Sequence, residues 1–174
     1  VVNMLFEIES LGFRCVAIYA GHAPLQKQLE GTLAAYHAQG GAADTIATEL
    51  AGMRELIVVA SGADRTAGRE LALKIEEATW LPTTHRDLET FLHGHLPSMD
   101  EQTGVVLILA DREGRAARSA RAQQAMAAAG RVGARAAGIL SEALDVEWPA
   151  FLLPAGRLVV PESPGLPAPV AVPP

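Results

Sequence analysis

The chain has 174 residues, which is enough for one domain with a sizeable core, and 49% of them are hydrophobic. Its net charge of −6 argues against a nucleic-acid-binding surface, which would be basic, and leaves no polybasic patch for anionic lipid. The single cysteine, Cys15, excludes an intrachain disulfide and a metal site of several cysteines, and its apolar neighbours indicate a buried, inert thiol.

The N-terminal part of the chain predicts helices. Apolar residues recur at helical spacing over 2–20, although 15–20 is also a continuous β-compatible run, so a strand there is the alternative. Two further helices are expected over 24–38 and 41–53, separated by glycines. No signal peptide or membrane span is visible, and we therefore expect a cytoplasmic protein that binds neither membrane nor nucleic acid.

From residue 55 onward, short apolar runs alternate with helical segments. Strands are expected at 56–60, 83–87, 105–110, 134–140 and 158–160. Helices are expected at 68–80, 88–92 and 115–129. This alternation predicts an α/β domain with right-handed crossovers and a parallel sheet. Ligands of such sheets bind beyond the carboxyl ends of the strands, where the loops 61–66 and 111–114 lie.

The helix at 68–80 carries charged residues beside its apolar stripe. Glu70, Lys74 and Glu77 fall on one narrow stripe at 100° per residue, whereas Arg69 and Glu76 face solvent. The neighbouring apolar stripe consists of Ala67, Leu71, Ile75 and Ala78. An ion-pair ladder on a helix surface explains this charged stripe equally well.

Other motifs in the chain carry less information. Neither nucleotide-binding glycine fingerprint is present, and Gly62 and Thr66 suit either a phosphate at a helix start or a plain turn and cap. His93 and His95 lack a third metal ligand at suitable spacing, so we expect no metal and no cofactor. The same patterns predict core or interface positions for Trp80 and Trp148, and a solvated basic face at Arg112, Arg115, Arg118 and Arg121.

Two of these segments together carry a resemblance to a known family. The run from Glu70 to Trp80, with its Leu-Lys-x-x-Glu motif, precedes an extended piece, the sequence Phe91-Leu-His-Gly94 and an apolar strand. This order resembles the second sugar isomerase (SIS) domain of the double-SIS phosphosugar isomerases, such as the isomerase half of glutamine–fructose-6-phosphate transaminase. The similarity covers roughly 45–173 and implies a three-layer sandwich with a flavodoxin-like parallel sheet. Residues 1–40 would then end a preceding SIS domain, and 41–174 would be an SIS domain with a truncated C-terminal tail.

The resemblance also implies roles for individual residues. Glu77 matches the base that moves a proton between C1 and C2 of a sugar phosphate, and Lys74 matches a lysine that helps to hold the sugar. His93 matches the histidine that opens the sugar ring, and in the family this histidine reaches a neighbouring subunit's site, which implies a homodimer with shared sites. Ser61 and Thr66 are the expected substrate-binding residues.

Some features depart from the family pattern. His95 replaces the proline that follows His-Gly, and Glu76 replaces a second lysine. The expected function is an aldose–ketose sugar-phosphate isomerase, or an aminosugar-phosphate isomerase or deaminase, with a hexose or hexosamine 6-phosphate as its ligand. A non-catalytic sugar-phosphate-binding regulatory module and a purely structural domain are the alternatives.

Overall fold

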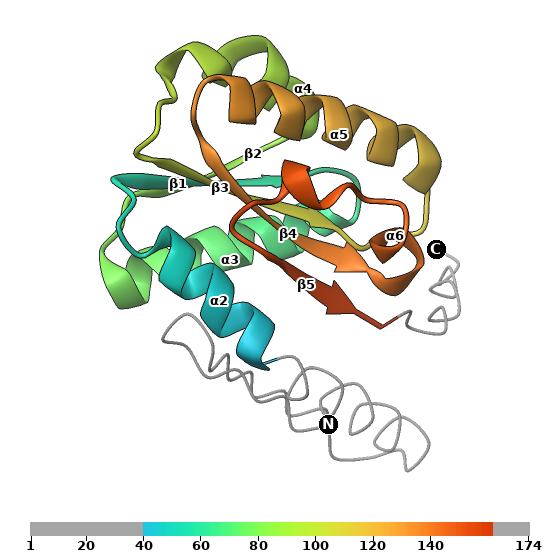
Figure 1. The fold of residues 1–174 in the computed structure, drawn as a ribbon, viewed down its shortest axis with the longest axis horizontal. Coiled ribbons are helices and arrows are strands. Elements are labelled where there is room, and N and C mark those ends of the chain that lie inside the picture. The colour runs from blue at the N-terminus through green and yellow to red at the C-terminus, as the bar shows by residue number, and fades with distance from the viewer. Residues whose placement is uncertain (1–39, 162–174) are drawn as a thin grey trace, which may run out of the picture.

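The computed structural model describes residues 40–161, and these residues form a five-stranded, all-parallel sheet in the order β2-β1-β3-β4-β5 (Figure 1). The strands are β1 (Glu55–Ala60), β2 (Thr83–Arg86), β3 (Thr103–Leu109), β4 (Arg135–Ser141) and β5 (Arg157–Val160). All five strands lie where the alternation of apolar runs predicted them. The predicted helices at 2–20 and 24–38, together with Cys15, lie outside the described residues.

Helices cover both faces of this sheet, as the predicted three-layer arrangement requires (Figure 1). The helices α2 (Gly40–Leu50) and α3 (Asp64–Thr79) pack on one face. The other face carries α4 (Leu88–Thr90), a π-helical turn (Phe91–His95), α5 (Arg115–Arg131) and the short α6 (Glu142–Asp145). The structure thus confirms the α/β fold class, with helix boundaries a few residues from those predicted.

The two central strands β1 and β3 are buried on both faces, which explains their continuous apolar sequences. On the α3 face, Val58 and Val106 contribute to one hydrophobic cluster with Leu71 and Ile75. On the α5 face, Val59 contributes to a second cluster, which includes residues of α4, the π-helical turn and α5. The alternation of side chains along a strand therefore builds two cores from one sheet.

Helix α3 buries a stripe that differs in part from the predicted one. Leu71 and Ile75 are buried as expected, but Ala67 and Ala78 are exposed, and the stripe continues instead through Ala72. The helix ends at Trp80, whose left-handed backbone (φ 57°) accompanies a side chain that is 90% exposed.

The two tryptophans therefore have opposite environments. Trp148 is 3% exposed, and its indole N–H donates a hydrogen bond to Ser119 Oγ over 3.0 Å, which confirms the prediction of a core residue. Trp80 lies outside the core, because it follows the last buried residue of α3, Ile75, by five positions. Of the two predicted environments, core or interface, the core is wrong for Trp80, and an interface position stays a prediction.

Candidate functional site

The last two turns of α3 hold the charged stripe that the sequence predicted. Lys74 Nζ lies 2.7 Å from Glu77 Oε2 and 3.8 Å from Glu70 Oε1. The hydrogen bond with Glu77 raises the pKa of Lys74 above its ordinary value, against the opposing effect of desolvation. Because Lys74 and Glu77 are 40% and 53% exposed, water screens this pair, and a ligand can reach both side chains.

The neighbouring Glu76 has a structural role that the sequence analysis missed. Its carboxylate accepts a hydrogen bond from the backbone N–H of Thr83 over 3.1 Å, so it links the end of α3 to the start of β2. Glu76 is exposed, as predicted, and this hydrogen bond is a contact that the prediction did not include. Helical periodicity could not reveal this contact, because the donor belongs to the next strand.

The candidate ring-opening residue, His93, lies on the π-helical turn and is 73% exposed. Its Nε2 atom is 3.4 Å from Glu89 Oε2 and 3.2 Å from Arg121 Nη2. Arg121 also binds Glu89 through two contacts of 2.7 Å each. The hydrogen bond from Arg121 lowers the pKa of Glu89, and the same bond raises the pKa of Arg121.

Within one chain, Lys74 and Glu77 do not meet His93. Helix α3 packs on one face of the sheet, whereas the π-helical turn packs on the other face through Phe91. The sheet thus separates the two groups of candidate residues (Figure 1). The described residues of one chain therefore do not form a site that uses both groups.

The predicted substrate-binding residues lie at the carboxyl end of β1. Ser61 Oγ accepts a hydrogen bond from the N–H of Leu88 over 2.9 Å and lies 3.5 Å from Asp87 Oδ1, so its hydroxyl binds the start of α4. Thr66 is exposed in the first turn of α3, about 16 Å along the helix axis from Glu77. The structure therefore brings neither residue to the charged stripe.

Two carboxylates and one arginine join the loops after β1 and β3. Asp64 accepts hydrogen bonds from the N–H groups of Ala110 and Asp111, each over 3.0 Å. Arg118 lies 3.4 Å from Asp64 Oδ2 and 3.0 Å from Asp111 Oδ2, and it donates to the carbonyl of Ser61 over 3.1 Å. These ion pairs occupy the point at which the connection after β1 leads to one face of the sheet and the connection after β3 leads to the other face. Ligands of such folds usually bind at this point.

These contacts correct the prediction of a solvated basic face on α5. Arg118 is only 16% exposed, and Arg121 is 35% exposed and paired with Glu89. Helical spacing could not reveal Asp64 as a partner of Arg118, because the two residues are 54 positions apart, nor Asp111, because it lies in the loop before α5. Burial alone would raise the pKa of Asp111, but hydrogen bonds from the N–H groups of Glu113 and Ala63 and the charge of Arg118 lower it.

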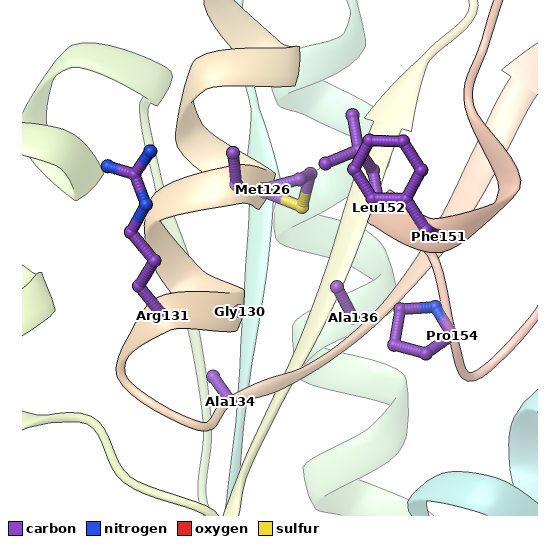
Figure 2. Close-up of a pocket in the computed structure, with 9 residues that line it drawn as sticks. Met126, Gly130, Arg131, Ala134, Ala136, Phe151, Leu152 and Pro154 are labelled. Carbon is purple, nitrogen blue, oxygen red and sulfur yellow. The ribbon is translucent and has the colours of Figure 1, made fainter.

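An open pocket of about 380 Å³ lies elsewhere, between the end of α5 and the start of β4 (Figure 2). Its lining is mainly apolar, with Arg131 and Phe151 on opposite sides in Figure 2. None of the predicted site residues lines it. Across residues 40–161, no group of three or more His, Cys, Asp or Glu side chains is arranged to hold a metal ion. No helix in the same range is long and apolar enough to cross a membrane.

Comparisons with known proteins give similarity in structure only. No protein-family model matches the sequence, and no curated protein matches it. The C-terminal domain of glucosamine-fructose-6-phosphate aminotransferase from Francisella tularensis aligns with a TM-score of 0.62 and 15% identity over 80% of this chain and 38% of that one. Tagatose-6-phosphate ketose/aldose isomerase from Escherichia coli aligns with a TM-score of 0.58 and 21% identity over 82% of this chain and 37% of that one.

The chain thus spans less than two fifths of the length of both solved structures. At these identities the similarity shows the fold alone. The order of the five parallel strands and the helices on both faces agree with that fold. The described residues therefore have the SIS-domain fold of the phosphosugar isomerases, as the sequence resemblance predicted.

Proposed function

We propose that this chain is a phosphosugar-binding SIS domain of an aldose–ketose sugar-phosphate isomerase, or of an aminosugar-phosphate isomerase or deaminase. The hydrogen-bonded pair of Lys74 and Glu77 carries the proposal. A carboxylate of this kind can accept a proton from one carbon of an open-chain sugar and return it to the next carbon. Both solved relatives are named for reactions of sugar phosphates, which supports this class of ligand.

The pair also has the electrostatics that the reaction needs. The ammonium group of Lys74 lies 2.7 Å from the carboxylate of Glu77, so a positive charge stands beside the group that would take the proton. The ammonium group has three donors, so it can bind a sugar hydroxyl while it stays close to Glu77. The exposure of both side chains leaves room for a ligand on this surface of α3.

In this proposal, His93 opens the sugar ring at the site of a second copy. The position of His93 across the sheet from Glu77 supports a homodimer in which each subunit completes the other's site. An imidazole suits the proton transfers of ring opening near neutral pH. Ser61 and Thr66 remain predicted contacts for a phosphate, at a point separate from the charged stripe, since Thr66 lies about 16 Å along α3 from Glu77.

Proton NMR of the full-length protein in D₂O, with a panel of hexose and hexosamine 6-phosphates, tests the proposal. We expect deuterium to enter C1 or C2 of one sugar. Glu77→Gln keeps the shape of the side chain but removes the base, so exchange should fall about 10²–10⁴-fold. Glu147→Gln, a change of an exposed glutamate away from α3, is the matched control and should leave the exchange rate unchanged.

The two alternatives give different results in the same experiment. Broadening of ligand signals without deuterium uptake would indicate a non-catalytic binding module. Normal exchange in both Glu77→Gln and His93→Ala would show that neither residue takes part in the chemistry.

A further inference from the structure

The side chain of His93 contacts two residues, Arg121 and Glu89, that lie outside the Leu-Lys-x-x-Glu and His-Gly motifs. Arg121 Nη2 lies 3.2 Å from His93 Nε2 with hydrogen-bond geometry, whereas Glu89 Oε2 lies 3.4 Å from the same nitrogen, a contact that is ionic only when the imidazole is protonated. An arginine N–H can only donate. In a hydrogen bond with Arg121 the ring nitrogen is the acceptor, and a neutral imidazole that accepts at Nε2 carries its hydrogen on Nδ1.

The guanidinium of Arg121 is itself held by hydrogen bonds to two residues, Glu89 and Gln124. Its Nε and Nη2 atoms donate to the two oxygens of Glu89, each over 2.7 Å, which is the bidentate geometry that a guanidinium prefers. Its Nη1 atom donates to Gln124 Oε1, one helical turn away, over 3.0 Å. The side chain is 35% exposed, which is about half the exposure of His93. The guanidinium is thus a prearranged donor for the imidazole.

The other ring nitrogen is available for chemistry. Among the described residues the structure gives no polar partner to His93 Nδ1, and the side chain extends into solvent. Opening a sugar ring breaks the bond between the anomeric carbon and the ring oxygen. The ring oxygen gains a proton in this step, and the anomeric hydroxyl loses one. A ring with its hydrogen on Nδ1 can give that proton to the ring oxygen and take the hydroxyl proton back.

We propose that Arg121, held by Glu89, is a positioning residue that fixes the tautomer and orientation of His93, so that Nδ1–H faces the sugar ring. This inference rests on the proposed function for its chemical consequence, but the state of the imidazole can be measured without any substrate. A donor at Nε2 also makes the Nδ1–H group a stronger hydrogen-bond donor, in the way that a neutral histidine serves as an electrophile in other isomerases.

The first test is ¹⁵N NMR of the full-length protein with labelled histidine, at a pH about two units above the ordinary pKa of histidine. His93→Gln identifies the signal of His93. We expect the wild-type ring to carry its hydrogen on Nδ1, and Arg121→Met to move it mainly to Nε2. Arg121→Lys, which keeps a donor, should retain part of the Nδ1 form, whereas Arg131→Met at the exposed end of the same helix should change nothing.

The second test separates ring opening from proton transfer between carbons. Fructose 6-phosphate forms a ring, whereas 5-deoxyfructose 6-phosphate cannot. We expect Arg121→Met to lower deuterium exchange about 10–100-fold with the first sugar, and to leave exchange with the second sugar nearly unchanged.

The possible failures are distinguishable. An unchanged tautomer and an unchanged ratio of the two exchange rates in Arg121→Met would overturn this inference while the proposed function stands. A wild-type ring with its hydrogen on Nε2 would overturn it as well. Absence of exchange with every sugar phosphate in the wild type would instead refute the proposed function, and the ¹⁵N result would still decide whether Arg121 sets the state of His93.

Discussion

A single glycine sets how closely α3 approaches the sheet. A Cβ atom at Gly68 would lie 2.7 Å from Ala60 Cβ and 2.8 Å from His85 Cδ2, distances that real side chains do not adopt. His85 in turn contacts the carbonyl of Ala60 over 3.1 Å through Nε2, so its ring has little freedom to move. The first turns of α3 can therefore pack on β1 and β2 only because this position has no side chain.

We expect Gly68→Ala to destabilise the protein by about 1–3 kcal/mol, because the extra methyl group pushes α3 away from β1. The free energy of unfolding in urea measures this loss. Gly130→Ala is the control: a Cβ atom there meets nothing within 4 Å, so alanine should stabilise α5 by up to about 1 kcal/mol. Equal stabilities for the two variants would contradict this account of the α3 contact.

Asp111 should give the protein a specific sensitivity to acid. Its pKa is lowered in the folded state, so its charged form stabilises the fold at neutral pH, and this contribution is lost as the pH falls through the folded pKa. Asp111→Asn should cost about 1–2 kcal/mol at pH 7, and the gap to the wild type should close below the ordinary aspartate pKa of about 3.9.

Urea midpoints at several pH values between 7 and 3 measure this effect. Glu147→Gln, which changes an exposed side chain, is the control and should give a small difference that does not depend on pH. A gap between Asp111→Asn and the wild type that stays constant down to pH 3 would show that the charge of Asp111 does not stabilise the fold.

At the level of elements, the first turns of α5 hold the carboxyl ends of two strands together. Arg118 contacts Asp64 at the start of α3 and Asp111 after β3, and it is mostly buried. The ion pairs of Arg118 therefore connect α5 to α3, which packs on the opposite face of the sheet, at the carboxyl ends of β1 and β3. Removing one member of such a group leaves the others unpaired, which costs more than the contact itself contributes.

We expect Arg118→Met to lower the free energy of unfolding by about 2–4 kcal/mol, since two carboxylates would lose their shared partner. Arg131→Met, the same change at the exposed end of α5, should stay within about 0.5 kcal/mol of the wild type. Chemical denaturation of both variants measures the difference. Similar values for the two would mean that solvent replaces Arg118 without cost.

The order of elements could be predicted because each one depends on its own sequence. Runs such as 105–110 are apolar throughout, and only a strand buried on both faces needs that pattern. The prediction for Arg118 and Arg121 was wrong for a related reason. Spacing along α5 places these residues on a helix face, but their partners lie on α3, on α4 and in the loop after β3, which the periodicity of α5 does not reveal.

At the level of the whole molecule, the sheet divides the proposed catalytic groups. Lys74 and Glu77 could be predicted as neighbours because they lie three positions apart on one helix. The sequence could not predict where His93 lies relative to this pair, because that depends on which face of the sheet carries the connection between β2 and β3. It also could not show that Ser61 binds the start of α4, because the partner residues lie 26 and 27 positions away.

Mixing two inactive variants tests the shared site. Glu77→Gln and His93→Ala should each lower deuterium exchange with fructose 6-phosphate, which forms a ring, to a small fraction of the wild-type rate in the full-length protein. When the two are co-expressed, a mixed dimer contains one site with both residues intact, so about a quarter of the wild-type rate should return. No recovery in verified mixed dimers would show that each subunit uses only its own residues. Co-expression of Glu77→Gln with Lys74→Met is the control, and because both changes lie on α3 it should give no recovery.

Because the two tryptophans differ so much in exposure, tryptophan fluorescence can report whether the end of α3 is covered. Trp80 follows Glu77 by three residues and is 90% exposed, whereas Trp148 is 3% exposed behind α5. Iodide in solution should therefore quench the emission of Trp80 and leave that of Trp148 nearly untouched. Any molecule that settles on the end of α3, whether a sugar phosphate or a second subunit, should shield the first indole from the quencher. Fluorescence titration of Trp148→Phe would then report occupancy of that surface directly.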